Sequence, residues 1–399
     1  MNSKMKGTAL VAHGGGPTHV INASLAGIVE ECRRHSAIGA LYGARHGIAG
    51  VLAEDFIDLF AQNPRRITAI GRTPGSALGS CRQEVSRDDY ERIVAVCRAR
   101  NIRYFFYTGG NGSMHTALHI SRIAREQRYE MRVIGVPKTI DNDLAETDHS
   151  PGYASAALFA ACAIRDIGED NRSLPTPVTV VEIMGRNAGW ITAATVFARH
   201  TADDAPHLVY LPERRLPEDR LFADVEAVYR RLGRVVVAVC EGQTDQRGIP
   251  FGDLGPPDGF QRRLSGNVAH TLATLITSRA GLRARSERPG LLGRSCSAFT
   301  SAVDRDEALL CGRAAVQAAL AGETEKMVTL IREPAGTYRI RTGLTELETV
   351  ANTERLFPAN WIAPEGNDVL PAFRDYAAPL IGPVDFYPRL DEQMAALPQ

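Results

Sequence analysis

The chain has 399 residues, 44% of them hydrophobic and 23% charged, a composition typical of a soluble protein with one large or two medium domains. Because Lys plus Arg and Asp plus Glu both number 46, the charge balance gives no support for a protein that binds nucleic acid or a membrane surface. Because residues 1–6 are followed by no long apolar run and no run of about 18 apolar residues occurs, we expect no signal peptide and no membrane span. The seven cysteines are scattered, so we expect a cytoplasmic protein with reduced thiols and no zinc site.

Short apolar strands alternate with helices through the first half of the chain, and glycine-rich turns join several strands to the helices that follow. Helical spacing of apolar residues marks the helices, while β-branched and aromatic runs mark the strands. From the N-terminus, the predicted elements are a strand at 8–12, a helix at 22–35, a strand at 40–42, a helix at 88–100, a strand at 104–107, a helix ending near 128 and a strand at 131–136.

The second half repeats this alternation. In chain order, we expect a helix at 154–167, a strand at 178–183, a helix ending near 199, a strand at 208–211, a helix at 218–232, a strand at 235–240, a polar loop at 243–257, helices at 266–279 and 304–321, and a strand at 327–331. Such alternation is typical of parallel sheets built from right-handed crossovers. The strands therefore predict an α/β fold with two Rossmann-like lobes, mostly parallel sheets and an active-site cleft between the lobes.

A polar segment at 137–143 follows the predicted strand at 131–136. In parallel α/β sheets, ligands bind just beyond the carboxyl ends of the strands. Asp141 and Asp143 are two residues apart, so in an extended segment they point the same way and can converge on one hydroxyl or metal ion. The alternative interpretation is a structural loop with Asx turns and a helix cap.

Three glycine-rich turns, at 14–16, 109–112 and 185–189, each follow a predicted strand and precede a predicted helix. Glycine lets the backbone approach a phosphate closely, and the free N–H groups of a helix start favour an anion. One such turn is weak evidence because tight turns need glycine anyway, but three in one chain favour a phosphate ligand. Neither a lysine-containing P-loop nor the dinucleotide fingerprint is present.

Arg82, Arg186 and Arg294 follow or lie within glycine-rich segments, and guanidinium suits bidentate phosphate binding. Glu241 ends an apolar strand, where a carboxylate can accept sugar hydroxyls. Taken singly, each arginine is better explained as a solvated surface charge, and Glu241 can also be explained as a helix cap or an ion-pair partner. Together with the two aspartates, these residues suit phosphoryl transfer, which needs cationic groups, a metal ion and a base for the acceptor hydroxyl.

These motifs resemble the phosphofructokinases over about residues 10–382. The length, residues 79–82 and the tail at 376–382 are most similar to the branch that holds many pyrophosphate-dependent enzymes. The most specific marks of the resemblance are residues 109–113, 137–143, 184–190 and 289–294.

The resemblance implies a sugar-phosphate kinase in which Asp141 is the base that deprotonates the sugar 1-hydroxyl. Asp143 would support it near the metal and the transferred phosphate, and Lys138 and Thr139 would contact the phosphoryl group. Mg²⁺ is the implied cofactor, with Asn111 and Asp141 as its implied ligands. A homodimer or homotetramer is expected.

By the same resemblance, residues 1–152 form a donor-binding lobe rejoined by 302–360, residues 153–301 form a sugar-phosphate lobe, and 361–399 are a C-terminal extension. The implied sugar-phosphate contacts are Met184, Gly185, Arg186, Glu241 and Arg294, the last often supplied by a neighbouring subunit in the family. The implied donor contacts are Gly15, Gly16, Arg82, Gly110, Asn111, Gly112 and Ser113.

Three positions depart from the family pattern. Asn111 stands where the family usually has an aspartate that helps to hold Mg²⁺, and an amide is a weaker ligand for a hard cation. Gly112 leaves room for a nucleotide where pyrophosphate users usually have aspartate, whereas Lys138 is the residue of the pyrophosphate users. Since glycine with lysine also occurs among ATP-dependent members, ATP is the expected donor and pyrophosphate the alternative. Pro177 replaces a common sugar-phosphate-binding cation, for which Arg172 is the nearby substitute.

The expected acceptor is fructose 6-phosphate. A changed acceptor such as sedoheptulose phosphate or allulose 6-phosphate, and transfer of a pyrophosphoryl group from ATP, are alternative activities on the same scaffold. A non-catalytic sensor of sugar phosphates or nucleotides is the alternative from another functional class, although a sensor has no need for the base Asp141.

Overall fold

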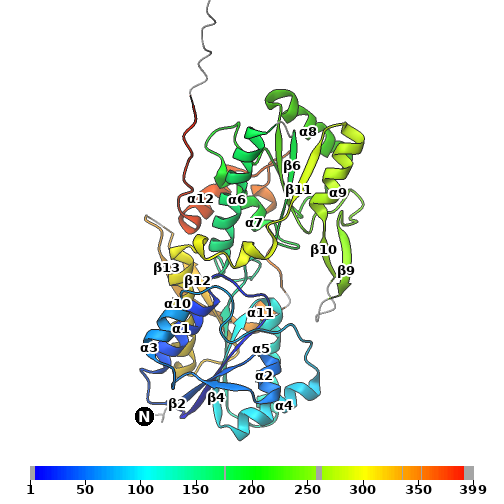
Figure 1. Ribbon diagram of the computed structural model, residues 1–399. Coiled ribbons are helices and arrows are strands. Elements are labelled where there is room, and N and C mark those ends of the chain that lie inside the picture. The colour runs from blue at the N-terminus through cyan, green and yellow to red at the C-terminus, as the bar shows by residue number, and fades with distance from the viewer. Residues whose placement is uncertain (1–4, 175–176, 258–262, 335, 352, 391–399) are drawn as a thin grey trace, which may run out of the picture.

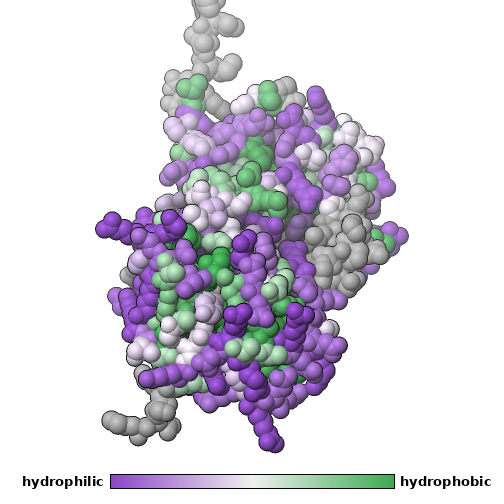
Figure 2. All heavy atoms as spheres, turned by 60° about the horizontal axis from the view of Figure 1, so that its bottom comes forward, coloured by the Kyte–Doolittle hydropathy of each residue, from purple (hydrophilic) through white to green (hydrophobic). Residues whose placement is uncertain are grey.

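The computed structural model describes residues 5–174, 177–257, 263–334, 336–351 and 353–390. The chain forms two lobes, each built on its own β-sheet and covered by helices, with the N-terminal lobe at the bottom of Figure 1. This arrangement confirms the predicted α/β class with mostly parallel sheets. Charged and polar residues dominate the face drawn in Figure 2, and no helix within the described residues has the length and apolar character that crossing a bilayer requires.

In the described residues, the first lobe has a seven-stranded sheet in the order β13-β12-β5-β4-β1-β2-β3. Its neighbours are parallel except at the two edges, where β3 and β13 run antiparallel. The strands are β1 (Gly7–His13), β2 (Ile38–Ala44), β3 (Phe56–Asp58), β4 (Ile102–Gly109), β5 (Arg132–Pro137), β12 (Lys326–Arg332) and β13 (Ile340–Glu346).

Alternate residues of the central strands enter two separate cores, as the period of a strand requires. On β4, Phe105 packs on one face and Phe106 on the other. One core includes α2 (Ile48–Ala53), α4 (Arg87–Ala99), α5 (Asn111–Glu126) and α11 (Leu347–Val350), and the opposite core includes α1 (Ile21–Cys32), α3 (Pro64–Ile70) and α10 (Ala302–Ala321).

Helices α1 and α10, far apart in the sequence, touch through their backbones. A Cβ added to Gly27 would lie 2.2 Å from the Leu309 oxygen, and one added to Gly312 would lie 2.1 Å from the Ser24 oxygen. Only glycine permits this approach at both positions. Residues 302–346 thereby return to the first lobe after the four strands of the second sheet, and η5 (Ala359–Trp361) and α12 (Pro371–Ile381) later rejoin the second lobe.

The second lobe has a parallel four-stranded sheet in the order β11-β6-β8-β7. One core lies against α6 (Tyr153–Ser173), α7 (Trp190–Ala194), η1 (Thr195–Ala198), η5 (Ala359–Trp361) and α12 (Pro371–Ile381), and the other against α8 (Glu218–Leu232), α9 (Val268–Leu275) and η2 (Ile276–Ala280). The strands are β6 (Val178–Ile183), β7 (Leu208–Tyr210), β8 (Val235–Cys240) and β11 (Ala284–Glu287).

Several predicted elements are corrected. The polar loop expected at 243–257 ends in β9 (Asp253–Pro257), which pairs with β10 (Arg263–Gly266), and the helix expected from 266 begins at Val268. The helix expected at 154–167 continues to Ser173. The edge strands β3 and β13 and the short helices α2, α3 and α12 were not predicted, because short elements give little periodic signal.

The segment between β5 and α6 crosses from one lobe to the other and is held by buried charges. His149, which has no exposed surface, contacts Asp148 at 2.8 Å and Glu307 of α10 at 2.5 Å. Asp304, also fully buried, accepts from the Gly152 and Ser155 N–H groups at 2.7 and 3.0 Å and so caps the start of α6. The crossing segment is therefore fixed to α10 before it enters the second lobe.

Substitution of His149 tests this network. Burial by itself would lower the pKa of His149, but the hydrogen bonds with Asp148 and Glu307 outweigh it and raise the pKa from 6.5 to about 8. The stabilisation is therefore complete below pH 6.5 and is lost as the pH rises through about 8. We expect the free-energy difference of unfolding between wild type and His149→Gln to shrink by about 2 kcal/mol over this interval. Denaturant titrations across the interval measure it, and a constant difference would contradict the charged network.

Candidate active site

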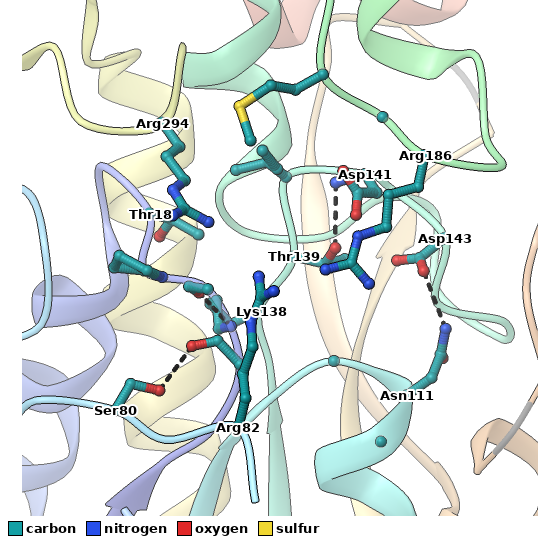
Figure 3. Close-up of a pocket in the computed structure, with 18 of the residues that line it drawn as sticks. Thr18, Ser80, Arg82, Asn111, Lys138, Thr139, Asp141, Asp143, Arg186 and Arg294 are labelled. Atoms are coloured by element: carbon teal, nitrogen blue, oxygen red, sulfur yellow. Dashed lines mark hydrogen bonds between the residues drawn. The ribbon is translucent and has the colours of Figure 1, made fainter. Parts of the chain in front are cut away.

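A cavity of about 680 Å³ lies between the lobes, at the carboxyl ends of strands from both sheets. In Figure 3, Arg186 and Arg294 reach into it from the second lobe, opposite Lys138, Arg82 and Asn111 of the first. All sixteen residues predicted for the site line this one cavity: Gly15, Gly16, Arg82, Gly110, Asn111, Gly112, Ser113, Lys138, Thr139, Asp141, Asp143, Met184, Gly185, Arg186, Glu241 and Arg294.

Lys138 fixes the first glycine turn. Its Nζ donates to the carbonyl oxygens of Gly14 and Gly16, at 2.8 and 2.6 Å, and only 3% of the residue is exposed. Gly15 has φ +77° and its carbonyl accepts from Ser80 Oγ at 2.7 Å, so the turn is held from two sides. Burial lowers the pKa of Lys138 to about 7, because a buried ammonium loses its hydration.

Close packing explains the glycines on the donor side. A Cβ on Gly14 or Gly109 would lie 2.3 or 2.0 Å from Ser113 Oγ, and a Cβ on Gly16 would lie 2.6 Å from Arg294 Nη1. At Gly112, by contrast, an added Cβ would meet nothing within 4 Å. Gly14 and Gly109 are therefore required by the packing of the site, a side chain at Gly16 would displace the guanidinium of Arg294, and Gly112 faces open space at the start of α5.

Asn142 turns the two aspartates toward the cavity. Its side chain is fully buried, accepts from the Ser150 N–H at 3.0 Å and donates to the Tyr376 hydroxyl at 3.1 Å. Its φ of +54° reverses the chain locally. Because Asn142 points into the protein, Asp141 and Asp143 on either side of it line the cavity.

Burial raises the pKa of both aspartates above the ordinary carboxyl range, since it penalises the charged form. The charge of Arg186 opposes this shift at Asp141, while the charge of Asp141 adds to it at Asp143. The two carboxyls therefore differ in environment, with the guanidinium favouring ionisation of Asp141. A carboxylate of raised pKa near an arginine suits a base that must accept a proton near neutrality.

The oxygens around Asp143 suit a hard cation. Asn111 Nδ2 donates to Asp143 Oδ2 at 3.0 Å, whereas Asn111 Oδ1 and Asp143 Oδ1 are buried without a hydrogen-bond donor. Buried oxygens of this kind are expected to find a partner, and Mg²⁺ takes one or two carboxylates together with substrate phosphates and water. Within the described residues no group of three or more His, Cys, Asp or Glu forms a metal cage, so such an ion would rely on its substrate for further ligands.

The second lobe contributes a strained turn. Gly185 and Arg186 have φ of +148° and +47°, and both donate their N–H groups to Glu241 Oε1 at 3.2 Å. Glu241 therefore fixes this turn in addition to lining the cavity. Burial raises the pKa of Glu241, and the two N–H groups counteract that shift.

The structure adds lining residues to which the sequence assigned no role. Ser80 and Leu291 lie inside the marked segments 79–82 and 289–294, and Arg288 directly precedes the second of them, so all three had a signal in or next to a motif. Glu354, from a distant part of the chain, had none. The added lining residues include Thr18, Ser76, Ser80, Arg288, Leu291 and Glu354.

Pro177 and Arg172 lie away from the cavity. Pro177 precedes β6, at the opposite end of the strand from Met184. Arg172 is paired with Asp204, 3.4 Å away, and does not line the cavity, so it does not replace a sugar-phosphate cation there. The prediction that Arg172 replaces the cation missing at Pro177 is therefore wrong within a single chain.

Comparison with known proteins agrees with this geometry. Residues 8–319 match the family described as phosphofructokinase. The chain belongs to the phosphofructokinase family. It is therefore a phosphofructokinase-type phosphotransferase, as the sequence resemblance predicted.

The similar proteins include three that carry the pyrophosphate-dependent name. The pyrophosphate–fructose 6-phosphate 1-phosphotransferase of Rhodospirillum rubrum is 41% identical over 94% of this chain and 95% of its own length, and that of Halomonas elongata is 39% identical over 95% and 93%. The crystal structure of the pyrophosphate-dependent phosphofructokinase of Marinobacter aquaeolei superposes with a TM-score of 0.86 at 36% identity, over 97% of this chain and 94% of that one. These comparisons lend no support to the expected ATP donor.

Replacement of Asn111 tests the metal interpretation. Asn111→Asp places a second carboxylate against Asp143. Without a metal the two like charges repel and destabilise the protein, whereas with Mg²⁺ the new carboxylate is a stronger ligand than the amide. We expect Mg²⁺ to raise the melting temperature of Asn111→Asp more than that of wild type. Gln127→Glu, which adds the same charge at the far end of α5, is the matched control. Equal Mg²⁺ responses in all three proteins would exclude a metal at Asn111.

Proposed function

We propose that this phosphofructokinase-family protein transfers a phosphoryl group from pyrophosphate to the 1-hydroxyl of fructose 6-phosphate. The observation that carries the proposal is the convergence of Asp141, Asp143 and Lys138 with arginines of both lobes in one cavity. That set supplies a base, a metal-facing carboxylate and cations for a phosphate, which phosphoryl transfer requires. The names of the similar proteins support the donor and the acceptor.

In this mechanism the acceptor lies against the turn at Gly185 and Arg186, and Asp141 accepts the proton of its 1-hydroxyl. The oxygen of that hydroxyl bonds to the nearer phosphorus of pyrophosphate, and the bridging P–O bond breaks to release inorganic phosphate. Lys138, Arg82 and the N–H groups at the start of α5 bind and orient the donor. Asp143 and Asn111, with Asp141, would hold Mg²⁺, which neutralises phosphate charge when bound.

Two features of the cavity favour different donors. Lys138 fixes the glycine turn next to Arg82 and Arg294, a compact cationic arrangement that needs no nucleotide. The open space at Gly112 favours the second candidate, an ATP-dependent enzyme, because it leaves room beyond the transferred phosphates. Pyrophosphate is preferred because similar proteins across nearly the whole chain carry that name.

A donor-by-acceptor activity matrix tests the proposal. Purified protein with Mg²⁺ is assayed with pyrophosphate or ATP against fructose 6-phosphate, allulose 6-phosphate and sedoheptulose 7-phosphate. Mass spectrometry of the products separates phosphoryl from pyrophosphoryl transfer. We expect fructose 1,6-bisphosphate from pyrophosphate. Product from ATP alone would reverse the donor assignment, and binding without any turnover would favour a sensor.

Gly112→Asp separates the two donors. The new carboxylate points into the open space at the start of α5, where it would repel and crowd the part of ATP beyond its transferred phosphate. We expect kcat/KM with ATP, if measurable in wild type, to fall by about 10-fold or more, which corresponds to one charged contact. The value with pyrophosphate should change less. Gly112→Ala controls for added volume, and unchanged ATP kinetics in Gly112→Asp would remove Gly112 from donor selection.

Asp141→Asn tests the base. The amide keeps the shape of the side chain but cannot accept the hydroxyl proton, so we expect turnover to fall by about 10²- to 10⁴-fold with little change in acceptor affinity. In wild type, the acid limb of kcat should lie at a higher pH than an ordinary aspartate with pKa 3.8 would give, because burial raises the pKa of Asp141. Stopped assays across pH measure both. Near-normal turnover of Asp141→Asn would exclude it as the base.

A further inference from the structure

Two histidines of α5 face each other one helical turn apart, outside the cavity. The Nε2 atoms of His115 and His119 are 3.0 Å apart, and the centres of the two rings are 4.3 Å apart. Residues four apart are neighbours on a helix surface, so both imidazoles lie on one side of α5, which packs against α4 and α11 in the first lobe (Figure 1). Neither histidine lines the active-site cavity, and the proposed mechanism uses neither.

The separation of the two nitrogens matches that of two ligands on one metal ion. With metal–nitrogen bonds of about 2.0–2.1 Å, two nitrogens on a tetrahedral ion lie about 3.3–3.4 Å apart, and two adjacent nitrogens on a square-planar or octahedral ion lie about 2.8–3.0 Å apart. The observed 3.0 Å falls within this span. A small rotation of the rings therefore directs both Nε2 lone pairs at one ion without any change in the helix.

The ring of His119 is held in place by a neighbour on α4. Tyr90 stacks on it, with ring centres 5.3 Å apart and the ring planes 24° from parallel. Tyr90 is only 7% exposed and belongs to the core of the lobe. A ring that is already fixed loses little rotamer freedom when it binds a ligand. The pair is therefore pre-organised on a rigid element.

The two rings have the protonation state and the surroundings that a metal needs. Burial lowers the pKa of both His115 and His119 below 6.5, and the charge of Arg122 adds to the shift at each, so both rings are neutral near pH 7. The charge of Arg122 is compensated by Glu348, 2.7 Å away, which reduces its repulsion of a cation. Without an ion, one neutral ring donates its Nε2–H to the other; with an ion bound, each ring would carry its proton on Nδ1.

The kind of donor atom decides which ion fits. Two imidazole nitrogens suit Cu²⁺, Ni²⁺ or Zn²⁺, whereas Mg²⁺ prefers oxygen ligands. In the part of the chain that the structure describes, no third His, Cys, Asp or Glu completes a site at this pair. Because both histidines are partly exposed, water can fill the remaining coordination positions. Such an ion differs in kind from the Mg²⁺ proposed at Asp143.

We propose that His115 and His119 form a two-histidine site for a transition-metal ion, which links two successive turns of α5. The helix begins at Asn111, and Asn111, His115 and His119 follow at intervals of four residues, so they share one side of it. A bound ion would stabilise the helix whose first N–H groups face the cavity. This assignment does not depend on the proposed function, because it involves no substrate. The competing interpretation is a simple hydrogen bond between two neutral imidazoles.

Equilibrium dialysis against Ni²⁺ tests the site. Protein stripped of metal by a chelator is dialysed near neutral pH with Mg²⁺ present. We expect wild type to bind Ni²⁺, and His115→Ala and His119→Ala to lose at least about 10-fold in affinity, because even groups that only orient a metal ligand contribute 10- to 100-fold. His119→Phe keeps a ring against Tyr90 without a nitrogen and should lose the same affinity. His270→Ala, which removes an exposed histidine of α9, is the matched control and should match wild type.

Two further measurements distinguish this site from an adventitious ion. Ni²⁺ should raise the melting temperature of wild type and of His270→Ala but not that of His119→Phe. Wild type should release Ni²⁺ as the pH falls below 6.5, because both rings must be neutral to bind it. Electron paramagnetic resonance of bound Cu²⁺ should show coupling to two imidazole nitrogens. Equal Ni²⁺ affinity in wild type and His119→Phe, or a Cu²⁺ spectrum without nitrogen coupling, would mean an adventitious ion only and would overturn the site.

Discussion

The geometry of the site depends on the crossing segment between β5 and α6, which has to carry polar groups through the interior between two lobes. A buried backbone tolerates this only if its donors and acceptors are paired. Asp304 takes the N–H groups that begin α6, and Arg355 donates to the Asn142 oxygen at 2.9 Å and the Asp148 oxygen at 2.7 Å. These bonds fix the backbone on both sides of Asn142, and the carboxylates of Asp141 and Asp143 therefore face the cavity. The position of these carboxylates therefore depends on buried hydrogen bonds of the crossing segment, which are made outside the cavity.

The cavity combines two kinds of positive charge. Arg186 and Arg294 line it with planar guanidinium groups, whereas the ammonium of Lys138 has a pKa of about 7, chiefly because burial removes its hydration. An arriving phosphate would offset the burial penalty and favour the ammonium form. If the donor binds here, as proposed, its binding and the protonation of Lys138 would favour each other.

The sequence carried enough information to find the site because its chemistry lies on a few strand ends. Asp141, Gly110 and Arg186 each follow an apolar run, and the carboxyl ends of parallel strands meet at one edge of a sheet. Glu354 was missed for the opposite reason: its proximity to the site exists only after residues far apart in the chain have been brought together. Pro177 was placed in the site by the resemblance alone, and the direction of β6 puts it at the other end of the strand. Short edge elements escaped prediction because three to seven residues hold too little periodicity.

The order of strands in the first sheet has a consequence for how the protein is made. Strand β5 lies between β4 and β12, and β12 begins at Lys326, after all the strands of the second lobe's sheet have been synthesised. During translation one edge of β5 keeps its N–H and C=O groups unpaired until β12 has been synthesised. The interval from Pro137 to Lys326 is nearly 190 residues. An exposed strand edge invites pairing with other chains. Because the two lobes are interleaved in the sequence, neither half of the nascent chain contains all of one lobe. The sheet of the first lobe is complete only when synthesis is almost finished.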